Sequence, residues 1–91
     1  MFEMVFKSEI VVENKKYDLN YSVCKLDEDI VELSVTKECK GNIVDKSMVR
    51  LAMIAFNDIV KFVGVMCENT VTPTSFRDIV EDMVFDKIIV G

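Results

Sequence analysis

The side chains best suited to nucleophilic or metal chemistry in this chain are three cysteines, Cys24, Cys39 and Cys67, and no histidine accompanies them. A cysteine nucleophile needs a lowered pKa and a partner base, which is usually histidine. The three positions form no CxxC pair, so their spacing indicates neither a zinc ribbon nor a disulfide framework. We therefore expect ordinary free thiols in a reducing cytoplasm, with no catalytic residue, no metal and no cofactor.

Carboxylates are the second group that could do chemistry, and they gather in two places. Asp27, Glu28 and Asp29 are consecutive, but they lack the alternating ligands and the glycine of a calcium loop, which favours a solvated turn. A second group, near the C-terminus, consists of Asp78, Glu81 and Asp82. Carboxylates at fixed spacing on a helix either form a solvated face or imitate nucleic-acid phosphates and occupy a basic groove of a partner protein.

The overall charge supports a protein partner and argues against direct nucleic-acid binding. The 91 residues include 16 acidic and 11 basic side chains, and the net charge is −5. Nucleic-acid affinity comes mainly from lysine and arginine that neutralise the phosphate backbone. The chain also has only three glycines and no GxGxxG, P-loop or GxSxG motif, so we do not expect an enzyme.

Three runs in residues 2–37 alternate between apolar and polar side chains, the period of a β-strand with one buried face. In residues 2–12 the even positions are mostly apolar and the odd positions mostly charged. A turn at 14–16 leads to a second run over 17–24, and a turn at 27–29 leads to a third run over 30–37. Short polar links between such runs indicate hairpins, so we expect an antiparallel meander.

The period changes after residues 40–42. Residues 45–67 are apolar on nearly every side of a helical projection and carry one narrow polar stripe, which predicts a helix that is covered on most sides. After Pro73, Ser75 and Asp78 have the spacing of a capping box, and apolar residues at helical spacing predict a second helix. Residues 85–91 fit either an extension of this helix or a short strand.

These elements predict one α+β domain over residues 1–91. We expect a three-stranded antiparallel meander followed by two helices, in the order βββαα, with a short C-terminal fourth strand as the alternative for residues 85–91. The 45–67 helix has more apolar surface than such a sheet covers, and large exposed apolar patches are rare on monomers. Self-association is therefore a further expectation, through Met48, Met53, Phe56, Val60 and Val63.

The chain has no signal-peptide pattern at its N-terminus and no uncharged apolar run of membrane-spanning length, so we expect a cytoplasmic protein with no membrane contact.

The chain is very short and acidic, its cysteines are expected to be free thiols, and its predicted order is βββαα. This profile is similar to that of small inhibitor proteins that phages and mobile elements use against host nucleases, including anti-CRISPR proteins. This resemblance implies a viral, non-enzymatic, protein-binding inhibitor. The leading hypothesis is a module that occupies a basic, nucleic-acid-binding surface of a partner through Asp27, Glu28, Asp29, Asp78, Glu81 and Asp82. The alternatives are a structural or adaptor homodimer that associates through the 45–67 helix, and a binder of a small ligand between sheet and helix.

Overall fold

The computed structural model describes the backbone of residues 2–52 and 55–90, and the side chains of residues 3–52 and 55–83. Four strands are followed by two helices: β1 (Phe2–Val12), β2 (Lys15–Lys25), β3 (Ile30–Cys39), β4 (Asn42–Ala52), α1 (Phe56–Glu68) and α2 (Pro73–Val90). The strands form one antiparallel sheet in the order β1-β2-β3-β4. The predicted α+β class, with a meander followed by two helices, is confirmed.

Two tight turns set the register of this sheet. Glu13 and Asn14, between β1 and β2, have φ angles of 51° and 66°, and Lys40 and Gly41, between β3 and β4, have φ angles of 52° and 83°. Positive φ at both central residues is the geometry of the two-residue turn whose twist matches that of a hairpin. Each turn therefore holds its two strands in fixed pairing.

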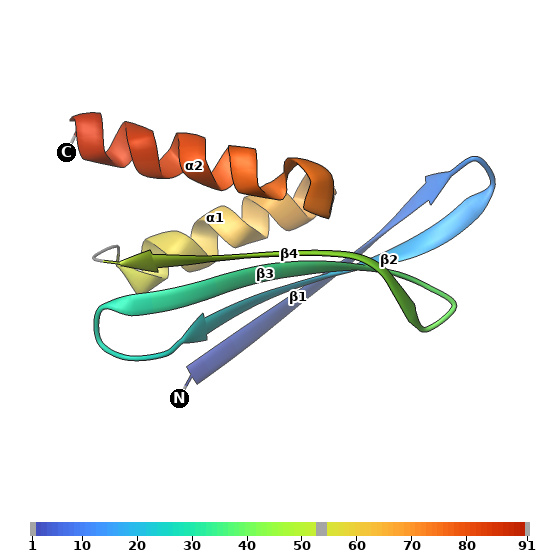
Figure 1. Cartoon of the computed structure of the whole chain (residues 1–91), viewed down its shortest axis with the longest axis horizontal. Helices are drawn as coiled ribbons and strands as arrows, with labels where there is room; N and C mark the ends of the chain where they lie inside the picture. The colour runs from blue at the N-terminus through green and yellow to red at the C-terminus, as the bar shows by residue number, and fades with distance from the viewer. Residues whose placement is uncertain (1, 53–54, 91) are drawn as a thin grey trace.

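Both helices pack on the same face of the sheet, α1 against β1 and β2, and α2 against β3 and β4 (Figure 1). The inward positions of β2 and β3 are apolar and buried, as their alternation predicts, and they meet apolar side chains from both helices. The core consists of Leu19, Tyr21, Val23, Val31, Leu33, Val35, Ile59, Val63, Met66, Phe76 and Val80. The other face of the sheet carries no helix.

The predicted single helix over residues 45–67 is wrong, because its first part is strand β4 and only residues 56–68 are helical. Val49 and Leu51 contact the core, whereas Lys46, Met48 and Arg50 are exposed, so the alternation of a half-buried strand is present in β4. The Lys40–Gly41 turn brings β4 back along β3, and backbone pairing with β3 decides its conformation. A short apolar segment fits the period of a helix or that of a strand. In this chain, pairing with β3 makes it a strand.

Of the two alternatives for residues 85–91, an extended helix or a short strand, the structure has the helix where it describes these residues. Helix α2 continues through Val90, and the fourth strand is β4. The helix begins at Pro73, two residues before the predicted Ser75, because proline suits the first helical position, where its missing N–H has no intrahelical partner. The carbonyl of Thr72 accepts hydrogen bonds from the N–H groups of Ser75 and Phe76 in this first turn.

The two hairpins continue past the helices and separate from each other. In Figure 1 the β1–β2 turn and the β3–β4 turn extend beyond the end of α1, one above the other. The last paired residues of β2 and β3 before this separation are Asp18 and Glu38. The uncovered face of the sheet and the gap between the hairpin turns therefore meet at Asp18 and Glu38.

Candidate functional site

Three carboxylates lie side by side on the uncovered face of the sheet. Glu9 of β1 is the direct cross-strand partner of Asp18 of β2, and Asp18 is the direct partner of Glu38 of β3. Side chains of directly opposite residues on one face are about 5 Å apart at their Cβ atoms. We call Glu9, Asp18 and Glu38 the carboxylate row.

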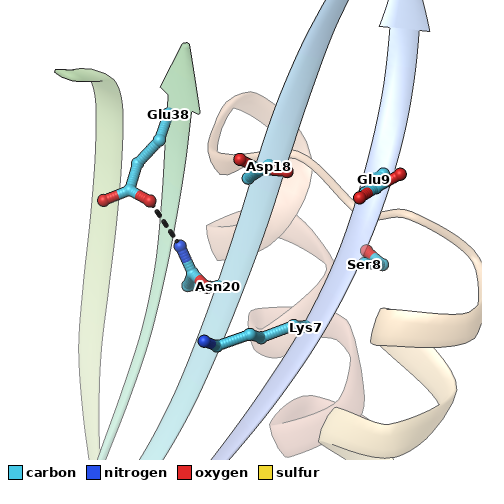
Figure 2. A pocket seen from close by; sticks show the side chains of 6 residues that line it. All are labelled: Lys7, Ser8, Glu9, Asp18, Asn20 and Glu38. Carbon is cyan, nitrogen blue, oxygen red and sulfur yellow. Dashed lines mark hydrogen bonds between the residues drawn. The ribbon is translucent and has the colours of Figure 1, made fainter. Parts of the chain in front are cut away.

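The carboxylate row lies over a hollow of about 480 Å³, and Figure 2 shows its side chains on three neighbouring strands. The Lys7 side chain extends over β2 toward Asn20 in the same view. The hollow is lined by Lys7, Ser8, Glu9, Asp18, Asn20 and Glu38. Three carboxylates and the ammonium group of Lys7 thus line one open depression.

Neighbouring side chains hold the two outer carboxylates in place. Lys16 Nζ lies 3.1 Å from Glu9 Oε1, and this hydrogen bond is the main reason why the pKa of Lys16 is raised above its ordinary value. Asn20 Nδ2 donates to Glu38 Oε2 over 2.8 Å. Asp18, between them, makes no hydrogen bond or ion pair within the described residues, although its charge adds to the rise in the pKa of Lys16. The central carboxylate is therefore free to receive a partner group.

The opposite end of the same face carries an ion pair. Arg50 Nε donates to Glu32 Oε2 over 3.0 Å, and in the centre the hydroxyls of Ser22 and Ser34 are 2.6 Å apart. Like charges directly opposite each other on a sheet are destabilising. The carboxylate row thus places three carboxylates on neighbouring strands, with Lys16 paired to Glu9 and Lys7 at the same hollow.

Within the described residues, no group of three His, Cys, Asp or Glu side chains is placed to hold a metal ion. Glu9 and Asp18 are exposed and Glu38 is half-buried. Such carboxylates can pair with the ammonium or guanidinium groups of another molecule.

The predicted acidic turn lies at the opposite end of β2. One carboxylate oxygen of Asp27 accepts hydrogen bonds from the N–H groups of Asp29, over 2.8 Å, and Ile30, over 3.0 Å. Asp27 therefore organises the turn between β2 and β3, whereas the side chains of Glu28 and Asp29 are exposed. A carboxylate that closes a turn in this way has a structural role of its own.

The predicted acidic helix face is present on α2. Asp78, Glu81 and Asp82 are exposed, and they make no ion pair within the part of the chain that the structure describes. Their neighbour Arg77 is turned away and donates from Nη2 to the carbonyl oxygen of Met48 over 3.3 Å. In Figure 1 α2 lies above α1, and the β2–β3 turn lies below α1 at the left end of the sheet.

The residues predicted for self-association are spread over two elements. Met48 is 41% exposed on edge strand β4, and Phe56 and Val60 are half-buried in α1. Val63 is 1% exposed in the core, and Met53 lies outside the described residues. The structure therefore does not bring this set together on one exposed face.

Sequence reasoning missed the carboxylate row. The alternation of β1 and β2 places Glu9 and Asp18 on the polar face, but only the register of three strands shows that they are neighbours of Glu38. The three cysteines are free thiols, as expected, and Cys67 Sγ donates to the carbonyl oxygen of Lys7 over 3.4 Å.

Two further findings concern the chain as a whole. None of the described helices combines the length and the hydrophobicity that a membrane crossing requires. The chain matches no protein-family model, no curated protein and no solved structure.

Proposed function

We propose that this protein is a small, acidic, non-enzymatic binding module that occupies a basic surface of a partner protein. The carboxylate row is the observation that carries this proposal. Two of its members are oriented by Lys16 and Asn20, and the third, Asp18, is unpaired within the described residues. A lysine or arginine of the partner that enters the hollow would lie among three carboxylates.

Electrostatic complementarity of this kind mainly speeds association and selects the partner. Each exposed ion pair contributes only about 0.2–1 kcal/mol, so the row needs several basic groups opposite it. Dense basic surfaces of this type are typical of proteins that bind nucleic acids. We therefore propose a nucleic-acid-binding partner, which the module inhibits by competing with its nucleic acid, in the manner of the anti-CRISPR proteins that the chain resembles in size, charge and layout.

Two variants with equal changes in charge separate the carboxylate row from the acidic face of α2. The row variant is E9Q/D18N/E38Q, and the helix variant is D78N/E81Q/D82N. The wild-type protein and both variants are used as bait in an extract of the native host, and the captured proteins are identified by mass spectrometry. The captured partner is then purified, and its binding to nucleic acid is measured with and without each form of the module.

We expect the wild-type and helix-variant proteins to capture the partner and displace its nucleic acid. The row variant should bind at least tenfold more weakly, which corresponds to about 1.4 kcal/mol, and all three affinities should fall as salt rises. Equal binding by the row variant and the wild-type protein, or loss of binding in the helix variant alone, would overturn the assignment to the carboxylate row.

A homodimer is the second candidate function, and the exposed apolar residues of β4 favour it. Ile43 and Val44 are more than half exposed, and Met48 lies on the same edge strand. An unpaired edge strand with apolar side chains is suited to association with another chain. Light scattering at high micromolar concentration tests this candidate, which requires a dimer mass and is excluded by a strict monomer.

A further inference from the structure

A second hollow, of about 460 Å³, lies where the two hairpins separate. It is lined by residues from both hairpins, so each hairpin turn contributes one side. The lining residues are Asn14, Lys15, Lys16 and Asp18 from the first hairpin, and Cys39 and Lys40 from the second. We call this space the hairpin hollow.

The hairpin hollow is basic, in a chain whose net charge is −5. Three lysines and one aspartate line it. Lys16 is held by Glu9, but Lys15 and Lys40 are exposed and make no ion pair within the described residues. Their two ammonium groups are therefore available to a negatively charged group.

The backbone fixes the position of both available lysines. Lys15 is the first residue of β2, and it directly follows the turn residues Glu13 and Asn14. Lys40 is itself a turn residue, with a φ of 52°, and Gly41 follows at 83°. Because each turn has only two residues between paired strands, the Cα atoms of the lysines are held by the sheet and not by a long loop.

Asp18 lines the hairpin hollow and also the hollow of the carboxylate row. The two hollows are therefore adjacent, one rich in carboxylates and the other in lysines. A surface that matches both must present a negative group directly beside its positive ones. Negative and positive groups placed side by side on one surface determine the register in which two proteins dock.

We propose that the hairpin hollow binds an aspartate or glutamate side chain of the same partner protein, through Lys15 and Lys40. This inference rests on the proposed function and specifies the partner further: its basic patch carries an acidic residue at the rim. The module is thus complementary to a positive and a negative group that lie side by side on the partner. Added negative charge at the hairpin turns weakens binding to the partner.

The test uses small probes that contain no basic group, so that the carboxylate row offers them no attractive contact. The ¹⁵N-labelled protein is titrated with acetyl-Gly-Glu-Glu-Gly-amide, with the matching Gln-Gln peptide, and with inorganic phosphate, all at low salt. The variants are K15Q/K40Q, the control K25Q/K61Q, which removes two lysines elsewhere, and E9Q/D18N/E38Q. Circular dichroism and amide spectra confirm that each variant is folded.

We expect the glutamate peptide to shift the amide signals of residues 14–16 and 39–41 with millimolar affinity. The K15Q/K40Q variant should bind this peptide at least fivefold more weakly, and K25Q/K61Q should bind it like the wild-type protein. The inference is overturned if the glutamine peptide produces the same shifts, if K15Q/K40Q binds unchanged, or if phosphate binds more tightly than the peptide. The row variant should bind the glutamate peptide at least as tightly as the wild-type protein, because it lacks the charge of Asp18 in the hollow and releases Lys16 from Glu9. A failure of the proposed function at the carboxylate row therefore remains distinguishable from a failure of this inference.

Discussion

Tyr21 connects the sheet to the loop between the two helices. Its ring is fully buried in the core, and its hydroxyl donates to the carbonyl oxygen of Val71 over 2.7 Å. The burial raises the pKa of Tyr21 above its ordinary value of 10.0. The protonated hydroxyl is therefore the form that the folded protein stabilises.

The substitution Tyr21→Phe should lower the free energy of unfolding by about 1–2 kcal/mol at neutral pH, because the carbonyl of Val71 loses its donor. The pH dependence should change as well. A pKa that is raised on folding contributes stability that is present below pH 10.0 and is lost as the pH rises through the folded-state value. Urea unfolding followed by circular dichroism between pH 8 and 11 should show a steeper loss in the wild-type protein than in the variant.

Tyr17 provides the matched control for this experiment. It is half-buried, and Lys37 Nζ lies 4.4 Å from the centre of its ring. Tyr17→Phe keeps the ring and leaves Tyr21 intact, so it should retain the wild-type slope above pH 10. An identical slope in the wild-type protein and Tyr21→Phe would contradict the role assigned to Tyr21.

At the scale of single elements, two glycines have opposite roles. Gly41 has a φ of 83° in the β3–β4 turn, where an added Cβ would meet no atom within 4 Å. Gly64 lies inside α1, where an added Cβ would meet Phe6 Cε2 at an ordinary contact distance of 4.0 Å. Space for a Cβ is available at both positions. The effect of replacing each glycine therefore depends on its backbone conformation.

We expect Gly41→Ala to lower the free energy of unfolding by about 1 kcal/mol, because L-residues rarely adopt this φ. Gly64→Ala should raise it by about 0.5–1 kcal/mol, because alanine favours a helix interior. Chemical denaturation of the two single variants measures both effects. Changes of the same sign would contradict the conformational explanation.

The elements also show what sequence alone could predict. Alternation correctly placed Leu19, Tyr21 and Val23 inward on β2, because one face of that strand is buried along its length. It failed for β4, whose apolar residues also fit a helix until its pairing with β3 is known. Pairing also explains why the carboxylate row was missed, since Glu9 and Glu38 are 29 positions apart in the sequence and become neighbours of Asp18 only through register.

At the scale of the whole molecule, the two faces of the sheet differ in what they contact. One face binds both helices and forms the core, so it is unavailable to a partner. The other face and the two hairpin turns are exposed, and they carry the carboxylate row and the hairpin hollow. Net charge alone would describe the protein as uniformly acidic, whereas its surface alternates between negative and positive at the end away from the helices.

The central claim is that the carboxylate row binds basic side chains, and a titration with a defined arginine peptide tests it most directly. The probe is an acetylated, amidated nine-residue peptide of alternating arginine and serine, added to ¹⁵N-labelled wild-type protein, the row variant E9Q/D18N/E38Q and the helix variant D78N/E81Q/D82N. The free energy of unfolding of each variant is measured first. We expect the row variant to be at least as stable as the wild-type protein, because opposed carboxylates repel.

We expect the amide signals of residues 9, 18, 20 and 38 to shift in the wild-type protein and the helix variant. The row variant should bind the peptide at least tenfold more weakly. Signals that shift mainly along α2, or an arginine-peptide affinity that is unchanged in the row variant, would contradict the central claim.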